Sequence, residues 1–336
     1  LLLVCLPLTA CNKSPASQPE AEKTNKAEPA TEKSTEARVL RLAHNITMGG
    51  TDDQAANMLA EKVKEKSGGT LEIKVYPGGQ LGNERDMLEG IQLGSIDMGL
   101  NTSAYISNIA PEFGLLDVPF LFSDFEDVRN ALSGDGGEYL KEKLLKEQGI
   151  RVLNWWNSSF RIMLTKSAPI KSLDDLKGRK MRAPEVPVYI DMFDALGANP
   201  TPIPFGEVYT SIQTGVVDGV EVCAEEMYAM KFHEVGKYIA KTNHIFSTMI
   251  PIINEDVFQS LTPDQQKVLQ EAVDETTDWQ WDAFRAADEH ALQAMGEAGV
   301  EINEIDQAPL AEACAEMQMK YATDYNAVEL LEMLKK

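Results

Sequence analysis

The chain has 336 residues, with 31 Lys and Arg against 53 Asp and Glu, so its formal net charge is −22 at pH 7. Such an acidic surface repels nucleic-acid phosphates and anionic bilayers, which argues against nucleic acid as a partner. The length is enough for two domains of about 150 residues each.

Residues 1–11, LLLVCLPLTAC, have the features of a signal segment. The apolar run is as long as a signal-peptide core and too short to span a bilayer. Its end, LTAC, resembles the site cut by lipoprotein signal peptidase, so Cys11 is predicted to be lipidated. In the alternative interpretation, Cys11 is incidental to an ordinary signal peptide. Residues 12–37 are highly polar and contain no apolar residue larger than Ala, which predicts a disordered tether.

The first ordered region is predicted to alternate strands and helices. Arg38 to Asn45 alternates as a strand, and Thr51 is expected to cap a helix whose first turn carries Asp52 and Asp53. Periodicity then predicts a strand at 71–75, a helix at 84–93 and a strand at 96–100. Asn101, Thr102 and Tyr105 follow that last strand, where open α/β sheets bind ligands. These three side chains can form hydrogen bonds without carrying a charge, although Tyr105 is equally well explained as a wall residue.

The middle of the chain is predicted to pass from one domain to the other. Asp124 begins a helical region that extends to Gln148, and strands are expected at 150–156 and 160–164. Asn157-Ser158-Ser159 lies between these strands and is interpreted as the crossing.

Residues 177–221 combine one prominent arginine, aromatic residues and a βαβ rhythm. Arg182 is expected to end a short strand, because the residue before Pro184 is restricted to extended conformations. Helices are predicted at 185–196 and 207–214, each followed by a glycine, and a strand at 216–222. A guanidinium at this strand end can hold one carboxylate through two parallel hydrogen bonds. Phe205, Tyr189 and Tyr209 are expected to cover the apolar part of a ligand, with at least one of them in the core instead.

The C-terminal region is dominated by one long helix. A strand is expected at 244–253, and Thr262 with Gln265 forms a capping box around Pro263. Nothing breaks the helical pattern before Gly296, so the helix should be about 50 Å long and lie across both domains. Trp279 and Trp281 lie within it and are predicted to pack in the core.

Four segments carry a resemblance to a known family: DLKGRKMRAPE, GANPTPIPFGEVYTSIQTGVVDGVE, KFHEVGKYIAKTNH and YPGGQLGNERDMLEGIQLGSIDM. From about Val39 to Asn326 the chain resembles the solute-binding proteins of tripartite ATP-independent periplasmic (TRAP) transporters. The resemblance implies an α/β, two-lobed periplasmic binding protein fold with a hinge. Lobe I would comprise residues 38–158 and about 247–285, and lobe II residues 159–246 and about 286–336. The implied partners are a small carboxylate ligand and the membrane subunits of a sodium-driven transporter, with no cofactor.

The resemblance also implies site residues. Asn45, Asn101 and Thr102 would line the ligand from lobe I, and Arg161 takes the place of a second ligand-facing arginine, although Ser159 replaces the family's usual glycine. Val222 stands where many members have an asparagine that bonds the ligand, so the ligand's polar pattern must differ there. Glu225 and Glu226 follow, and a carboxylate here could meet an ammonium or hydroxyl group. Glu225 is the predicted contact, against the alternative of a solvated helix start.

The sequence contains no complete catalytic motif. His233-Glu234 begins like a zinc-protease helix, but Lys237 stands where the second histidine must be. The sequence therefore predicts an extracytoplasmic binding protein and neither an enzyme nor a metal site. The alternative is a protein that presents its ligand to a sensor kinase or chemoreceptor, which adjacent genes would reveal. Cys223 and Cys314 are expected to remain free thiols, since their spacing indicates no disulfide framework.

Overall fold

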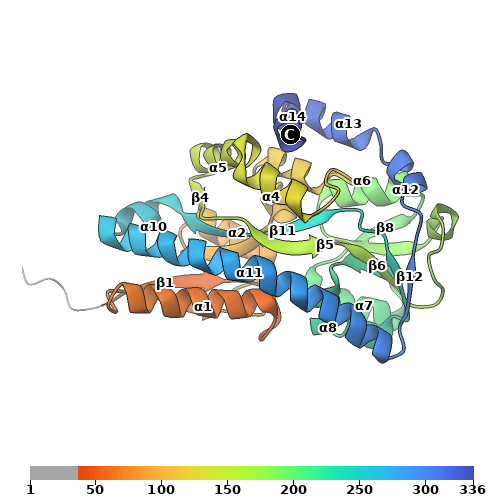
Figure 1. The fold of residues 1–336 in the computed structure, drawn as a ribbon, viewed down its shortest axis with the longest axis horizontal. Helices are drawn as coiled ribbons and strands as arrows, with labels where there is room; N and C mark the ends of the chain where they lie inside the picture. Colours follow the sequence, from red (N-terminus) through yellow and green to blue (C-terminus); the bar gives the residue numbers. More distant parts are fainter. Residues whose placement is uncertain (1–36) are drawn as a thin grey trace, which may run out of the picture. The chain divides into compact units, whose positions relative to one another are not determined.

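The computed structural model describes residues 37–336, which contain two β-sheets with helices around them (Figure 1). The predicted signal segment, with Cys11, and all but the last residue of the predicted tether lie outside the described residues. Within 37–336, no helix has the length and apolar character needed to cross a membrane.

The first sheet has six strands in the order β2-β1-β3-β11-β4, with β5 also pairing with β11. Strand β1 runs parallel to β2 and β3, whereas β11 is antiparallel to β3, β4 and β5. The strands are β1 (Arg38–Ala43), β2 (Leu71–Tyr76), β3 (Met98–Thr102), β4 (Ile150–Val152), β5 (Trp156–Phe160) and β11 (Phe246–Asn254). The predicted α/β class of this region is therefore confirmed.

The second sheet also has six strands, in the order β12-β10-β6-β9-β7-β8. Its strands are β6 (Ile162–Thr165), β7 (Lys180–Ala183), β8 (Asn199–Pro202), β9 (Gly219–Val222), β10 (Tyr238–Lys241) and β12 (Glu301–Glu304). Strand β7 is parallel to both β8 and β9, as the βαβ rhythm of the sequence predicts. The register places Arg182 beside Thr201 on one side and Val220 on the other.

The helices surround these sheets (Figure 1). The helices that follow strands of the first sheet in sequence are α1 (Thr51–Lys66), α2 (Glu84–Gln92), α3 (Ser103–Ile106), α4 (Phe125–Ser133), α5 (Asp135–Gln148) and α10 (Glu255–Ser260). Those that follow second-sheet strands are α6 (Pro187–Ala195), α7 (Val208–Thr214), α8 (Ala224–Ala229), α9 (Phe232–Val235), α12 (Ala308–Ala313), α13 (Met317–Asp324) and α14 (Val328–Leu334). Short 3-10 turns occupy Pro111–Asp117, Leu173–Leu176 and Phe205–Glu207. In sequence α14 comes last, yet it packs against α5 and α4.

Helix α11 (Pro263–Glu297) joins the two halves of the structure. Its first half contributes Leu269 and Val273 to the core under the first sheet, and its second half contributes Phe284 and Met295 to the core under the second. The capping box between Thr262 and Gln265 is present, so the predicted long helix that spans both lobes is confirmed. Because the polypeptide also crosses between the sheets at Arg161 and again over 242–245, three segments connect them.

Two local predictions are wrong. The segment Asn157-Ser158-Ser159, expected to connect strands, lies inside β5, because α11 satisfies its polar groups. The Asn157 N–H donates to Oε1 of Gln280 (2.8 Å), and its Nδ2 donates to the Trp281 carbonyl (3.2 Å). Ser159 adopts a left-handed φ of 62°, the conformation that glycine takes most readily and that explains the glycine expected at this position.

The start of α1 also differs from the prediction. Gly50 is its N-cap and provides no side-chain cap, while Thr51 is the first helical residue. The Thr51 N–H and hydroxyl both point to Glu225, a residue of α8. A carboxylate from elsewhere in the fold therefore replaces the local cap that the sequence suggested.

Candidate ligand-binding site

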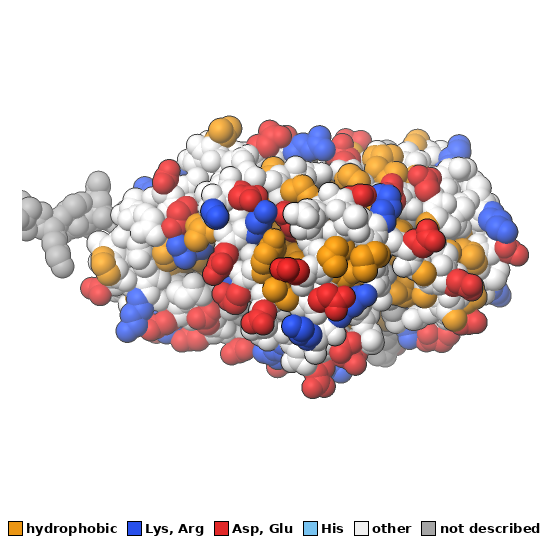
Figure 2. All heavy atoms as spheres, turned by 90° about the horizontal axis from the view of Figure 1, so that it is seen from above, with side chains coloured by type: hydrophobic (Ala, Val, Ile, Leu, Met, Phe, Trp, Pro, Cys, Tyr) orange, Lys and Arg blue, Asp and Glu red, His pale blue; other side chains and the backbone are white. Residues whose placement is uncertain are grey.

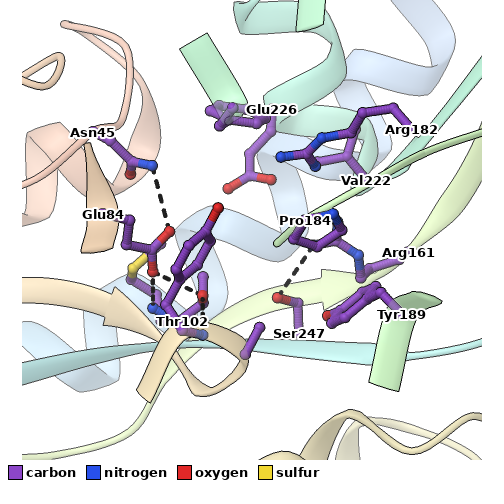
Figure 3. Close-up of a pocket in the computed structure, with 14 residues that line it drawn as sticks. Asn45, Glu84, Thr102, Arg161, Arg182, Pro184, Tyr189, Val222, Glu226 and Ser247 are labelled. Carbon is purple, nitrogen blue, oxygen red and sulfur yellow. Dashed lines mark hydrogen bonds between the residues drawn. The ribbon is translucent and has the colours of Figure 1, made fainter. Parts of the chain in front are cut away.

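A cavity lies between residues of the two sheets, and most of the predicted site residues line it (Figure 3). Its walls are formed by Asn45, Glu84, Thr102, Ala104, Tyr105, Arg161, Arg182, Pro184, Tyr189, Phe205, Val222, Glu226, Ser247 and Met249. Strands β3 and β11 of the first sheet and β7 and β9 of the second all contribute. The arrangement agrees with the rule that α/β sheets bind ligands at the carboxyl ends of their parallel strands.

Arg182 is held rigidly but has no acidic partner. Its side chain is only 2 % exposed, its Nε–H donates to the Ile203 carbonyl (2.9 Å), and its guanidinium lies 5.9 Å from the centre of the Phe205 ring. Burial lowers the pKa of Arg182, with partial compensation from nearby acidic groups. Among the described residues, no Asp or Glu lies within 4.0 Å of its guanidinium, in contrast to Arg161. A buried cation in this state is prepared for an anionic ligand.

Arg161 is already paired. Its Nε and Nη2 bond both carboxylate oxygens of Glu221, with Nη2 to Oε1 at 2.8 Å, and Nη2 also donates to the Glu221 carbonyl (2.9 Å). Burial would raise the pKa of Glu221, but the charge and hydrogen bonds of Arg161 outweigh it and lower that pKa. Only Nη1 remains for the cavity, where it lies 3.5 Å from Oγ of Ser247. The arginine that the family resemblance marked as a ligand contact thus carries a structural ion pair as well.

Tyr189 forms the cavity wall beneath Arg161. Its ring centre lies 5.1 Å from the Arg161 guanidinium, and its hydroxyl donates to Oδ1 of Asp117 at 2.8 Å. Burial raises the pKa of Asp117 to about 7, although the hydrogen bonds to its carboxylate oppose the shift. Tyr189 is fully buried, so its role combines core packing with the lining of the cavity.

Glu84 and Glu226 place two carboxylates in the cavity. Oε1 of Glu84 accepts the Thr102 N–H (2.5 Å) and hydroxyl (2.8 Å), and Oε2 accepts from Nδ2 of Asn45 (3.4 Å). Burial raises the pKa of Glu84 despite these bonds. Burial likewise raises the pKa of Glu226 to about 7, with the positive charge of Arg161 opposing the shift. Glu84 was not among the predicted site residues, and of the adjacent pair Glu225 and Glu226 the prediction chose Glu225, whereas Glu226 lines the cavity.

Three predicted site residues do not line the cavity. Asn101 is buried behind it and donates from Nδ2 to the Glu84 carbonyl (3.2 Å), so it supports the start of α2. Tyr209 donates its hydroxyl to Glu234 (3.2 Å). Glu225 accepts the Thr51 N–H (2.9 Å) and hydroxyl (3.0 Å), which links α8 to α1.

The remaining wall is apolar. Val222 ends β9 in the cavity, and Met249, Pro184 and Ala104 add further carbon surface. The sequence carried no signal for Met249 or Ser247, since β11 is buried along its whole length and its periodicity does not show which face meets the cavity. Cys223 and Cys314 are free and buried. In the part of the chain that the structure describes, no cluster of His, Cys, Asp and Glu is arranged to hold a metal ion.

Two sheets joined by three connections, with a polar cavity between them, define a two-lobed solute-binding protein. Residues 42–327 match the family described as bacterial extracellular solute-binding protein, family 7. The chain belongs to this family, which confirms the resemblance to TRAP solute-binding proteins. Members of the family and the structural neighbours are binding proteins, and this chain is a binding protein and not an enzyme.

Individual relatives cover most of the chain. The 2,3-diketo-L-gulonate-binding periplasmic protein YiaO of Escherichia coli is 34% identical over 278 residues, 82% of this chain and 84% of its own. The C4-dicarboxylate-binding protein DctB of Bacillus subtilis is 32% identical over 241 residues, 72% of this chain and 69% of its own.

Solved structures show the same fold. The sugar acid binding protein DctPAm of Advenella mimigardefordensis, in complex with galactonate, superimposes with a TM-score of 0.85 at 28% identity, covering 89% of this chain and 98% of that one. A TRAP periplasmic solute-binding protein of Sulfurospirillum deleyianum with bound succinate gives a TM-score of 0.84 at 25% identity, covering 90% and 99%.

Proposed function

We propose that this protein captures a small solute with a carboxylate group, an organic acid or a sugar acid, and delivers it to the membrane component of a TRAP transporter. The observation that carries the proposal is Arg182, a buried guanidinium that faces the cavity without an acidic partner. A carboxylate would supply the missing charge through two parallel hydrogen bonds. The bound solutes of the structural neighbours, galactonate and succinate, share that group.

A thermal-shift screen against organic acids and sugar acids tests this function. A solute at 100 times its dissociation constant should add about 2.7 kcal/mol of stability and raise the melting temperature accordingly. Uncharged sugars of the same size serve as the control and should have no effect. A screen in which a neutral sugar stabilises the protein while no carboxylate does would contradict the proposal.

We also propose that the two sheets mark two lobes that close on the solute. Lobe I would comprise residues 38–158 and about 247–285, and lobe II residues 159–246 and about 286–336. The hydrogen bonds between Glu225 and Thr51 connect α8, which follows the second sheet's β9, to the N-terminus of α1, which follows β1 of the first. The first N–H groups of a helix have no partner within the helix and attract negative charge, so Glu225 would hold the closed form.

Replacing Glu225 with Ala should therefore weaken solute binding without removing a cavity residue. The loss of hydrogen bonds to a charged group corresponds to about 1.5–3 kcal/mol, or roughly tenfold to a hundredfold in affinity. Small-angle scattering at subsaturating solute should show a larger radius of gyration for the variant than for the wild type. Glu225→Gln keeps an acceptor and should recover part of the affinity. Wild-type affinity in the Ala variant would rule out this role.

For Cys11 we propose lipidation, which would anchor the protein to a membrane on its extracytoplasmic side. The support is the LTAC sequence before a polar tether. Intact-mass spectrometry of the native protein should show an acylated chain that begins at Cys11. An unmodified mature chain that begins after Cys11 would exclude the anchor.

A further inference from the structure

Glu226 faces the cavity with a carboxylate that has no cationic partner among the described residues. It belongs to the first turn of α8, directly after β9, and Figure 3 shows its carboxylate pointing into the space between Glu84 and Arg182. Within residues 37–336, it forms no ion pair, whereas Glu221 behind it is fully paired with Arg161. The turn of α8 explains the difference from Glu225, since consecutive helical residues point about 100° apart. One carboxylate therefore faces α1 and the next faces the cavity.

The charges around the cavity separate into a paired set and an unpaired set. Arg161 and Glu221 neutralise each other, and burial lowers the pKa of His244 beside Glu221, which disfavours its charged form. Arg182 remains as the cation available to a solute. Two acidic side chains face it: Glu84, whose carboxylate accepts three hydrogen bonds, and Glu226, whose carboxylate forms no ion pair within residues 37–336.

This distribution can accommodate one carboxylate but not two. The first carboxylate of a solute meets Arg182, and the opposite side of the cavity then presents acidic oxygens. A second carboxylate there would lie beside like charges, which costs several kcal/mol in a closed interface. Hydroxyl groups, in contrast, donate hydrogen bonds to carboxylates, and such charge-assisted bonds are stronger than those between neutral groups.

We propose that Glu226 is a specificity-determining residue that selects hydroxylated monocarboxylates and excludes dicarboxylates. In this assignment Arg182 holds the single carboxylate, and Glu226, with help from Glu84, accepts hydrogen bonds from hydroxyl groups at the other end of the solute. Val222 contributes to the same preference, because its isopropyl group leaves no amide donor for a second anionic group. The inference rests on the proposed function and narrows its solute class.

Matched pairs of solutes test the selection directly. Galactonate and galactarate differ only in the terminal group, which is a hydroxymethyl in the first and a carboxylate in the second. Erythronate and meso-tartrate form a four-carbon pair that likewise differs only in the terminal group, a hydroxymethyl in the first and a carboxylate in the second. Titration calorimetry at pH 8, above the pKa of about 7 for Glu226, should show tighter binding of the monocarboxylate by at least about tenfold in each pair.

The variant Glu226→Gln removes the charge and keeps the size of the side chain. The preference for the monocarboxylate should shrink by about tenfold or more, chiefly because the dicarboxylate binds better. Glu207→Gln is the matched control, since it makes the same change of net charge at an exposed residue that does not line the cavity, and its preference should equal that of the wild type. A circular-dichroism melt of both variants verifies that they fold.

Three outcomes would overturn the inference. The first is a wild-type protein that binds dicarboxylates as tightly as their monocarboxylate partners. The second is a Glu226→Gln variant whose preference is unchanged. The third is a protein that binds carboxylates without hydroxyl groups better than either hydroxylated acid. Failure to bind any carboxylate in the wider screen would instead contradict the proposed function itself, so the two failures are distinguishable.

Discussion

Replacing Arg182 with Ala is expected to weaken solute binding by at least about a hundredfold while the protein still folds. The solute carboxylate would be left in a closed cavity without its partner, and removing one side of a buried charge pair costs about 3–5 kcal/mol. Each 1.4 kcal/mol is about a tenfold change in affinity. Arg182→Lys should recover little, because one ammonium cannot reproduce two parallel hydrogen bonds in a fixed plane.

The structure sharpens this expectation for the solute-free protein. Since Arg182 has no acidic partner among the described residues, its removal breaks no ion pair and eliminates a buried unpaired charge. The free energy of unfolding of the Ala variant without solute should therefore change little, because the loss of the hydrogen bond to Ile203 and of packing is offset by the removal of a buried unpaired charge. Calorimetric titration measures the affinity, and denaturation measures the stability. A less stable variant with nearly native affinity would show that Arg182 has a structural role instead.

The repeating pattern of the second sheet explains why the location of Arg182 could be predicted from sequence. A proline directly after a short alternating run ends a strand, and two helices closed by glycines return the chain to parallel neighbours. The bounds observed for β7, α6 and α7 agree with these signals to within a few residues. The long helix could also be predicted from the sequence, because a capping box and an unbroken helical pattern are both local features.

The direction in which each side chain points was harder to predict from the sequence. Glu225 and Glu226 are adjacent and chemically identical, and only the placement of α1 beside α8 determines which one enters the cavity. The cavity position of Glu84 could not be predicted either, since the favourable interaction with the helix dipole is enough to explain an acidic residue in the first turn of a helix. The buried strand residues Asn157 and Ser159 depend on partners from α11, more than a hundred residues away in sequence. Local patterns do not contain such information.

Replacing Arg161 with Ala should produce the largest loss of stability among the cavity variants. The Arg161–Glu221 pair is buried on both sides, with side chains 7% and 0% exposed. Removing the arginine leaves the buried Glu221 carboxylate with His244, whose pKa is lowered by burial, as its only neighbour of opposite potential charge, and this should lower the free energy of unfolding by about 3–5 kcal/mol. Solute affinity, measured where the variant is folded, should fall less than in Arg182→Ala, because only Nη1 of Arg161 is not committed to Glu221.

A double-variant cycle and a pH series identify the cause of that loss. Glu221→Ala alone should also destabilise the protein, whereas the double variant should cost less than the sum of the two, because no charge then remains unpaired. Since the pKa of Glu221 is lowered in the folded protein, the contribution of the pair is fully present above the ordinary glutamate pKa and is lost as the pH falls through the lowered value. The stability gap between wild type and Arg161→Ala should therefore narrow in acid. Strictly additive variants and a gap that does not change with pH would show that Arg161 stabilises the fold through packing alone.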